Sequence, residues 1–186
     1  MNNSAATTQE RKMIKLVILD IDGILTDGRK YYGTDGMPYA KTFCDKDFTA
    51  IKRLRGAGIN VCFLSGDDVV NRAMAKNRNI DFYYARGKDK ADFIAGFIET
   101  YKVDKSEMAY VGDDLFDMSI MKIVKYAFCP NDSPDKIKNL CGQKNIIDRP
   151  GGHNVVARLV DLLLSRNLIS DCTLADIEKL DKNEKF

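Results

Sequence analysis

Two carboxylates, two residues apart, follow a buried apolar segment near the start of the chain. Residues 14–19 are apolar except for Lys15, and Asp20 and Asp22 come directly after them. Such a run, rich in β-branched residues, predicts a strand that is buried on both faces. Carboxylates there are costly unless a cation or hydrogen bonds compensate their charge. Because ligands bind at the carboxyl ends of strands in open α/β sheets, we interpret Asp20 and Asp22 as a metal site that contains a nucleophile.

Polar residues also stand at the ends of two further predicted strands. Ser65 follows the apolar segment 59–64, and Asp113 and Asp114 follow the segment 108–111. The carboxyl ends of parallel strands share one edge of a sheet, so we expect these side chains to converge on the first two carboxylates.

The converging groups indicate phosphoryl transfer. Oxygen ligands without histidine or thiolate suit Mg²⁺, and a lysine at a predicted helix start, Lys90 or Lys88, would neutralise a phosphoryl group. An aspartate can attack phosphorus to give an aspartyl-phosphate, while a second carboxylate protonates the leaving oxygen and then activates water. Each residue alone also has a structural interpretation: Ser65 as a helix cap, or Asp117 as an acid favoured by a helix dipole.

Composition excludes several other classes. The chain of 186 residues has a formal net charge of +2, from 29 basic and 27 acidic residues, which predicts no nucleic-acid partner. No apolar run is long enough for a membrane span, and residues 1–12 lack the apolar segment of a secretory signal. An odd count of 5 cysteines without a CxxC pair indicates free thiols and a cytoplasmic location, and the single His153 excludes a multi-histidine metal centre.

Strand and helix signals alternate along the chain, which predicts an α/β fold with a mostly parallel sheet and helices on both faces. A β-hairpin is expected over residues 28–43, after the first strand. We expect residues 1–12 to be a disordered lead-in, residues 13–165 to form one domain, and residues 166–186 to form a C-terminal tail with one or two amphipathic turns. Further segments are expected as strands at 82–84, 126–129 and 146–147, and as helices at 45–55, 69–79, 88–101, 117–123, 134–140 and 155–165.

Four segments resemble the motifs of the haloacid dehalogenase-like phosphatases. They are Asp20-Ile21-Asp22-Gly23-Ile24-Leu25-Thr26-Asp27, then Ser65-Gly66, a lysine near position 90, and Gly112-Asp113-Asp114-Leu115-Phe116-Asp117. The resemblance implies a three-layer Rossmann-like fold. It also implies that Asp20 is the nucleophile and Asp22 the general acid and base, and that Ser65, Gly66 and Lys90, with Lys88 as the alternative, hold the phosphate. Mg²⁺ would be bound by Asp20, Asp22 (through its backbone carbonyl) and Asp113, supported by Asp114 or Asp117.

The intervals between these motifs are too short for the cap domain that most relatives carry, so we expect a partner subunit to cover the site. Further segments resemble the 3-deoxy-D-manno-octulosonate 8-phosphate phosphatase subfamily: Thr26-Asp27-Gly28, Tyr31-Tyr32-Gly33-Thr34-Asp35-Gly36, Phe43, Asp47 and Arg149-Pro150-Gly151-Gly152. That resemblance implies a homotetramer whose hairpins meet at its centre and whose sites are completed by a neighbouring subunit.

The activity expected from this resemblance is Mg²⁺-dependent hydrolysis of 3-deoxy-D-manno-octulosonate 8-phosphate, a step of lipopolysaccharide sugar synthesis. One alternative is a phosphatase of nine-carbon sialic-type sugar acid 9-phosphates, and another is a non-catalytic oligomerisation domain of the same fold. Two departures leave the sugar acid open: Asp67 stands where relatives usually have arginine, and Asn154 where they have glycine. The expected substrate contacts are Thr26, Arg72, Arg149, Gly151 and Gly152, with Arg78, Lys76 and His153 as further options.

Overall fold

The computed structural model describes residues 12–184. The expected lead-in therefore lies outside the described residues, apart from Lys12. None of the described helices is long and apolar enough to cross a membrane.

The core is a six-stranded sheet in the order β5-β4-β1-β6-β7-β8, and its neighbouring strands pair in parallel. Leu19 of β1 lies opposite Phe63 of β4 and Val111 of β6. This register brings the residues after the three central strands to the same edge, as the sequence predicted. The strands are β1 (Leu16–Leu19), β4 (Asn60–Ser65), β5 (Asp81–Tyr84), β6 (Met108–Val111), β7 (Tyr126–Pro130) and β8 (Ile146–Ile147).

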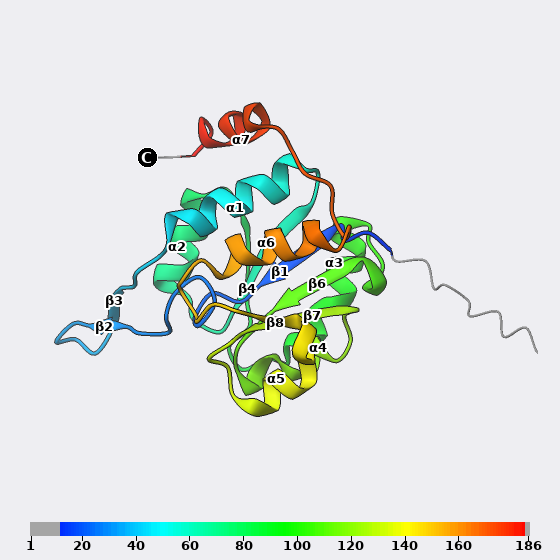
Figure 1. Ribbon diagram of the computed structural model, residues 1–186. Helices are drawn as coiled ribbons and strands as arrows, with labels where there is room; N and C mark the ends of the chain where they lie inside the picture. Colours follow the sequence, from blue (N-terminus) through cyan, green and yellow to red (C-terminus); the bar gives the residue numbers. More distant parts are fainter. Residues whose placement is uncertain (1–11, 185–186) are drawn as a thin grey trace, which may run out of the picture.

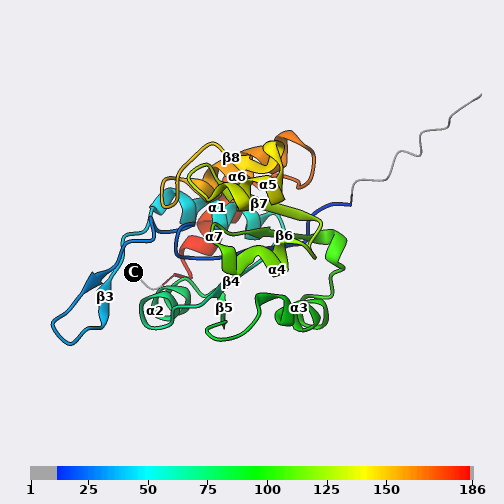
Figure 2. The same ribbon diagram turned by 90° about the horizontal axis from the view of Figure 1, so that it is seen from below.

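Helices cover both faces of this sheet, so the expected three-layer fold is confirmed (Figures 1 and 2). The side chains of β1 alternate between two hydrophobic clusters: Val17 and Leu19 face one, and Leu16 and Ile18 face the other. The first cluster lies under α1 (Asp45–Gly56), α2 (Val69–Asn77) and α6 (Val155–Ser165), and the second under α3 (Ile94–Tyr101), α4 (Met118–Met121) and α5 (Asp135–Cys141).

The hairpin after the first strand consists of β2 (Tyr31–Tyr32) and β3 (Pro38–Ala40), which pair antiparallel. It extends away from the three layers (Figure 1). Tyr31, Tyr32 and Met37 are more than half exposed, at 56%, 60% and 53%. The expected hairpin is therefore present, and it presents large apolar side chains to solvent.

Three segments differ in extent from the helices that the sequence predicts. The segment predicted as a helix from 88 to 101 begins as a 3₁₀ turn, Lys90–Phe93, and continues as α3. The segment predicted as a helix from 117 to 123 is a 3₁₀ turn, Leu115–Asp117, followed by the short α4, because Asp114 already caps the chain at the earlier position. The tail forms α7 (Leu174–Asp181), which is capped by Thr173 and packs against α1. Lys52 of α1 pairs with Asp181 at the end of α7 and, at 3.1 Å, with Glu184 beyond that helix.

Candidate active site

The centre of the site is a buried ion pair between Asp20 and Lys90. Asp20 follows β1 and Lys90 begins the 3₁₀ turn Lys90–Phe93 after β5. The Lys90 Nζ atom lies 2.6 Å from Asp20 Oδ2, and Asp20 Oδ1 accepts a hydrogen bond of 2.7 Å from the backbone N–H of Ile21. Burial raises the pKa of Asp20 to about 7, against the opposing attraction of the lysine. The oxygen atoms of Asp20 therefore lie in a dry, strongly polar environment.

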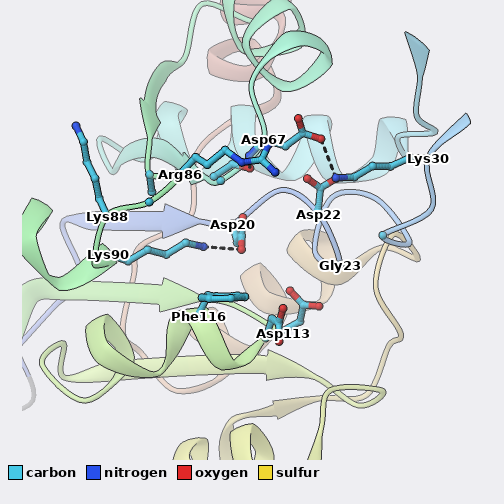
Figure 3. Close-up of a pocket in the computed structure, with 16 residues that line it drawn as sticks. Asp20, Asp22, Gly23, Lys30, Asp67, Arg86, Lys88, Lys90, Asp113 and Phe116 are labelled. Carbon is cyan, nitrogen blue, oxygen red and sulfur yellow. Dashed lines mark hydrogen bonds and ion pairs between the residues drawn. The ribbon is translucent and has the colours of Figure 1, made fainter. Parts of the chain in front are cut away.

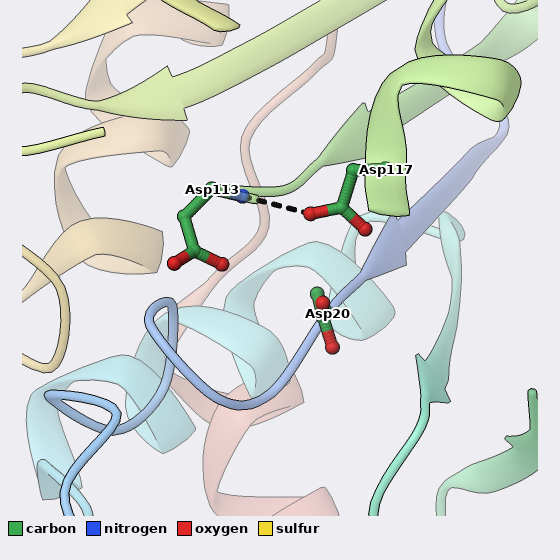
Figure 4. Close-up of side chains that lie close together, drawn as sticks. All are labelled: Asp20, Asp113 and Asp117. Atoms are coloured by element: carbon green, nitrogen blue, oxygen red, sulfur yellow. Dashed lines mark hydrogen bonds between the residues drawn. The ribbon is translucent and has the colours of Figure 1, made fainter. Parts of the chain in front are cut away.

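Asp117 supports this pair from the other side. Its Oδ1 atom accepts from Lys90 Nζ and from the Tyr110 hydroxyl, both at 2.6 Å. Its Oδ2 atom accepts from the backbone N–H groups of Asp113 at 2.9 Å and of Asp114 at 3.0 Å (Figure 4). Burial lowers the pKa of Lys90, but the two carboxylates more than offset this effect and hold that pKa above its ordinary value. Asp117 thus fixes both the lysine and the loop that carries Asp113.

Three carboxylates come together as a group that fits a divalent cation. Asp20, Asp113 and Asp117 each offer an oxygen atom, and these atoms lie within 4.8 Å of one another. Asp113 Oδ1 is buried without a hydrogen-bond partner among the described residues, and burial together with the charges of Asp20 and Asp117 raises the pKa of Asp113 to about 8. An unpartnered buried oxygen in an all-oxygen set is the arrangement that Mg²⁺ would satisfy.

Gly23 leaves the space that Asp113 needs. Its φ is +83°, and a Cβ atom there would lie 2.0 Å from Asp113 Oδ2. A side chain at this position would displace the carboxylate as well as strain the backbone. Position 23 of the first motif must therefore be glycine, because the Asp113 carboxylate of the fourth motif occupies the space beside it.

The side chain of Asp22 points away from the three-carboxylate group. It accepts hydrogen bonds from Lys41 Nζ at 2.7 Å, from Asn71 Nδ2 at 3.1 Å and from Thr26 Oγ1 at 3.3 Å. The Lys41 side chain is fully buried and also contacts Asp67 at 2.7 Å. The sequence did not point to Lys41 or Asn71, because Lys41 follows a strand of the hairpin and not of the central sheet, and Asn71 lies within α2.

Ser65 lies at the edge of the same network. Its Oγ atom accepts from Asn71 Nδ2 at 3.0 Å and from the backbone N–H of Asp67 at 3.2 Å. Both contacts use the oxygen as an acceptor, so the hydroxyl proton remains available to an anion. Gly66, the next residue, is exposed at the cavity.

A cavity of about 710 Å³ opens over these groups (Figure 3). Its outer part is lined by Lys30, Arg86, Lys88 and the ring of Phe116, which is 81% exposed. Lys30 pairs with Asp67 at 2.9 Å. Burial raises the pKa of Asp67, but hydrogen bonds from Lys41 and Lys30 outweigh it and bring that pKa to about 2. The carboxylate that replaces the usual arginine is therefore neutralised by two lysines.

The sequence missed Lys30 and Arg86 for different reasons. Arg86 comes just after β5, so the strand-end argument used for Asp20 and Ser65 would have found it. Lys30 belongs to the hairpin segment. No periodic pattern of apolar residues there predicts that its side chain reaches the cavity. Of the two lysines left open, Lys90 contacts Asp20, whereas Lys88 is exposed with its Nζ 5.7 Å from the centre of the Phe93 ring.

None of the five residues expected to contact substrate lines the cavity. Thr26 is fully buried beneath Asp22. Arg72 lies over the Phe82 ring at 4.8 Å and pairs with Asp68. Arg149 bonds to the backbone of its neighbour Asp148. Their positions in the sequence predicted contacts with substrate, but in the folded chain these side chains contact other groups of the protein.

The two glycines of that group support the first motif from behind. A Cβ atom at Gly151 would lie 2.3 Å from the carbonyl oxygen of Gly23, and one at Gly152 would lie 2.6 Å from the backbone nitrogen of Asp27. The N–H of Gly152 donates to Ile24 at 3.0 Å. The resemblance near residue 150 therefore reflects close packing against the loop after β1.

The remaining options also lie outside the cavity lining. The Arg78 guanidinium lies 3.8 Å from the centre of the Phe48 ring, and Arg78 pairs with Glu184. His153 Nδ1 lies 2.8 Å from its own loop at the Gly151 carbonyl. Asn154 adopts φ +65° at the start of α6 and accepts from the Cys44 thiol at 2.9 Å.

Comparison with known proteins supports the family resemblance. A sequence model described as haloacid dehalogenase-like hydrolase matches residues 67–148. The 3-deoxy-D-manno-octulosonate 8-phosphate phosphatase of Haemophilus influenzae is 29% identical over 157 residues, which cover 84% of this chain and 86% of that protein. The chain is similar to the haloacid dehalogenase-like hydrolases over most of its length. The expected resemblance and the expected fold are both confirmed.

Solved structures of this hydrolase family support the same assignment. The cobalt-bound form of the Haemophilus influenzae phosphatase matches with a TM-score of 0.76 and 29% identity, covering 83% of this chain and 90% of that one. The phosphatase of Moraxella catarrhalis, in complex with a magnesium ion, a phosphate ion and KDO, matches with a TM-score of 0.75 and 26% identity, covering 84% and 89%. These hydrolases therefore hold divalent metals on the same fold.

Proposed function

We propose that this hydrolase removes the phosphate group of 3-deoxy-D-manno-octulosonate 8-phosphate through an aspartyl-phosphate. The observation that carries the chemistry is the buried contact between Asp20 and Lys90, 2.6 Å apart beside two further carboxylates. The substrate is the one that the similar phosphatases of Haemophilus influenzae and Escherichia coli are named for.

The reaction follows from the positions of four side chains. An oxygen of Asp20 attacks phosphorus, the ester P–O bond breaks, and Asp22 supplies the proton that the leaving sugar oxygen takes up. Asp22 then removes a proton from water, whose oxygen attacks the aspartyl-phosphate, so inorganic phosphate leaves and Asp20 is restored. Lys90 and the Ser65 hydroxyl hold the phosphate oxygens and neutralise their charge.

Mg²⁺ would be held by Asp20 and Asp113, with the backbone carbonyl of Asp22 completing the set and Asp114 and Asp117 in support. The unpartnered Asp113 Oδ1 atom and the raised pKa of that carboxyl support this assignment. A bound Mg²⁺ supplies positive charge that neutralises the transferring phosphoryl group.

A homotetramer in which a neighbouring subunit completes each site is part of the proposal. The exposed side chains of Tyr31, Tyr32 and Met37 on the projecting hairpin support it, because such apolar groups favour burial against another chain. A monomer in light scattering would count against the shared site.

The five free cysteines are consistent with the proposed cytoplasmic location.

One observation favours a second candidate, a nine-carbon sialic-type sugar acid 9-phosphate. Asp67 occupies the cavity edge where the resembled subfamily usually carries arginine, and it uses both Lys30 and Lys41 as partners. The cavity edge at Asp67 is therefore less positively charged than it would be with an arginine there. The Asp67 carboxylate can accept hydrogen bonds, which suits a leaving group with more hydroxyl groups.

Phosphate release from a panel of esters tests both candidates. The purified chain with Mg²⁺ is compared on 3-deoxy-D-manno-octulosonate 8-phosphate, nine-carbon 9-phosphates and p-nitrophenyl phosphate. The highest kcat/KM on the eight-carbon ester supports the main proposal, and a preference for the nine-carbon esters supports the second. No release from any ester would leave only a non-catalytic oligomerisation domain.

The Asp20→Asn variant tests the nucleophile within the same assay. We expect turnover to fall by about 10⁴-fold or more, as for the loss of a nucleophile in other hydrolases. Circular dichroism and light scattering check that the fold and assembly are unchanged. Retained turnover in this variant would refute the assignment of Asp20.

A further inference from the structure

Arg86 is a cation in the cavity that has no partner among residues 12–184. It follows β5 and Ala85, its side chain is exposed, and it lines the cavity. Its guanidinium forms no hydrogen bond or ion pair with any described residue. In Figure 3 the side chain extends from the end of β5 across the cavity, toward the side on which Asp22 and Asp67 lie.

Three lysines in or beside the cavity already form ion pairs with carboxylates of the chain. Lys90 is held by Asp20 and Asp117. Lys41 contacts Asp22 and Asp67, and Lys30 contacts Asp67 as well. A phosphate bound at the reactive end would be met by Lys90 and Ser65. The charge of Arg86 is therefore not needed for the phosphate or for internal pairing.

The backbone around Arg86 is fixed to the phosphate end of the cavity. The N–H of Ala85, which is buried, donates to the carbonyl oxygen of Ser65 at 2.9 Å, and the N–H of Lys88 donates back to Ala85 at 3.0 Å. Gly87 takes φ +72° within this turn. The turn sets the base of the Arg86 side chain at a defined place relative to Ser65 and Lys90.

A free guanidinium in a cavity of about 710 Å³ recognises a second anion on the bound molecule. Its planar fork of N–H donors matches a carboxylate with two parallel hydrogen bonds. The other cation on this turn, Lys88, points away from Asp20 in Figure 3 and lies beside the Phe93 ring. Of the two cations on this turn, Arg86 is therefore the one placed to meet a second anion.

We propose that Arg86 binds the carboxylate of the substrate and makes the chain selective for phosphate monoesters of acids over those of neutral polyols. This inference rests on the proposed phosphatase function, whose site it shares, but it does not depend on which sugar acid is hydrolysed. Arg86 is a specificity residue that contacts the far end of the substrate, while Asp20 and Asp22 react at the phosphate.

A matched pair of esters isolates the carboxylate. 6-Phosphogluconate and glucitol 6-phosphate have the same open carbon chain and phosphate, and they differ in a carboxylate against a hydroxymethyl group. We expect wild type to show about a 10-fold higher kcat/KM for 6-phosphogluconate, and Arg86→Gln to remove this preference, as expected for one charged hydrogen-bonded contact. Arg86→Lys should restore part of it. p-Nitrophenyl phosphate has no carboxylate, so kcat/KM on this ester should fall less in both variants than kcat/KM on 6-phosphogluconate.

Arg72→Gln is the control, since Arg72 is an exposed arginine that does not line the cavity. It should leave both esters unaffected. A preference for 6-phosphogluconate that survives in Arg86→Gln, or a wild type that hydrolyses both esters equally well, would overturn the inference whether or not 3-deoxy-D-manno-octulosonate 8-phosphate is hydrolysed.

A binding measurement separates this inference from the proposed function. In the Asp20→Asn background with Mg²⁺, calorimetry should show about 10-fold tighter binding of 6-phosphogluconate than of glucitol 6-phosphate. Adding Arg86→Gln should make the two affinities equal. If the binding preference depends on Arg86 but wild type hydrolyses no ester, the phosphatase function is rejected and the carboxylate subsite is retained. Equal affinities in the Asp20→Asn background would reject the subsite even if the phosphatase is active.

Discussion

The ammonium group of Lys41 lies 2.7 Å from the carboxylate of Asp22 and is fully removed from solvent. The same group contacts Asp67 at 2.7 Å and Asn71 Oδ1 at 2.8 Å. Lys41 therefore joins the loop after β1 to the loop after β4, although it comes from the hairpin side of the chain. It fixes the residue that we assign as general acid and base.

Replacing Lys41 should impair catalysis through Asp22. In Lys41→Met, Asp22 and Asp67 lose their shared cation, so the proton donor is no longer positioned, and we expect kcat on sugar phosphates to fall by about 10²-fold. Lys30→Met is the matched control, because Lys30 pairs with Asp67 alone and is 29% exposed. Its kcat should remain near that of wild type.

The leaving group distinguishes this effect from a general loss of structure. p-Nitrophenolate leaves with little need of a proton, whereas a sugar alkoxide needs one. Lys41→Met should therefore retain much more activity on p-nitrophenyl phosphate than on sugar phosphates. An equal loss on both kinds of ester would show that Lys41 supports the fold and not the proton transfer.

The structure also separates the two neighbouring lysines Lys90 and Lys88. Lys90→Met removes a buried cation that lies 2.6 Å from both Asp20 and Asp117, and we expect kcat/KM on p-nitrophenyl phosphate to fall by about 10²-fold or more. Lys88→Met should have no effect on this ester, since Lys88 has only the Phe93 ring beside it. Circular dichroism shows whether the Lys90 variant is folded. The opposite ranking of the two variants would contradict the phosphate site described here.

Metal binding should stabilise the chain more as pH rises. Burial is the main cause that raises the pKa of Asp20 to about 7 and the pKa of Asp113 to about 8, well above the ordinary value of an aspartate. Between about pH 4 and about pH 8 the metal-free native chain binds more protons than the unfolded chain, so its stability falls as pH rises through this window. Mg²⁺ binds the deprotonated carboxylates and offsets this loss.

Thermal unfolding with and without Mg²⁺ measures this dependence. The rise in Tm on adding Mg²⁺ should be larger at about pH 8 than at about pH 5. The Asp113→Asn variant should lose most of the Mg²⁺ response at both pH values. A response that is greatest at the lower pH would be incompatible with carboxylates of raised pKa as the ligands.

The close approach of Gly23 and Asp113 predicts a defect in metal affinity. Gly23→Ala forces a side chain into φ +83° and onto the Asp113 carboxylate, so we expect the Mg²⁺ concentration for half-maximal activity to rise by about 10-fold or more. Gly58→Ala is the control: its φ is +79°, but no atom lies within 4 Å of its added Cβ. Both variants should lose about 1 kcal/mol of stability through backbone strain. An equal Mg²⁺ requirement in the two variants would exclude the steric explanation.

Some parts of the molecule follow from local sequence alone. The apolar run before Asp20 specifies a buried strand, and similar runs before Ser65 and Asp113 specify two more. Parallel pairing then puts the ends of these strands at one edge, because the register keeps them level. The tail was harder to predict, since Leu174, Ile177 and Leu180 give only a weak apolar stripe, and α7 is held by contacts with α1 that are distant in sequence.

The sequence by itself therefore determined the fold class, the family resemblance and the place of the carboxylates, since these depend on periodicity and on residues adjacent in the chain. Only the tertiary structure decided which cations meet them. Lys41, Lys30 and Arg86 reach the cavity from a hairpin and a turn, whose paths are set by packing and not by a repeating pattern. Long side chains from such segments can point to several partners, and the choice between Lys88 and Lys90 depended on which ammonium group enters the buried space between Asp20 and Asp117.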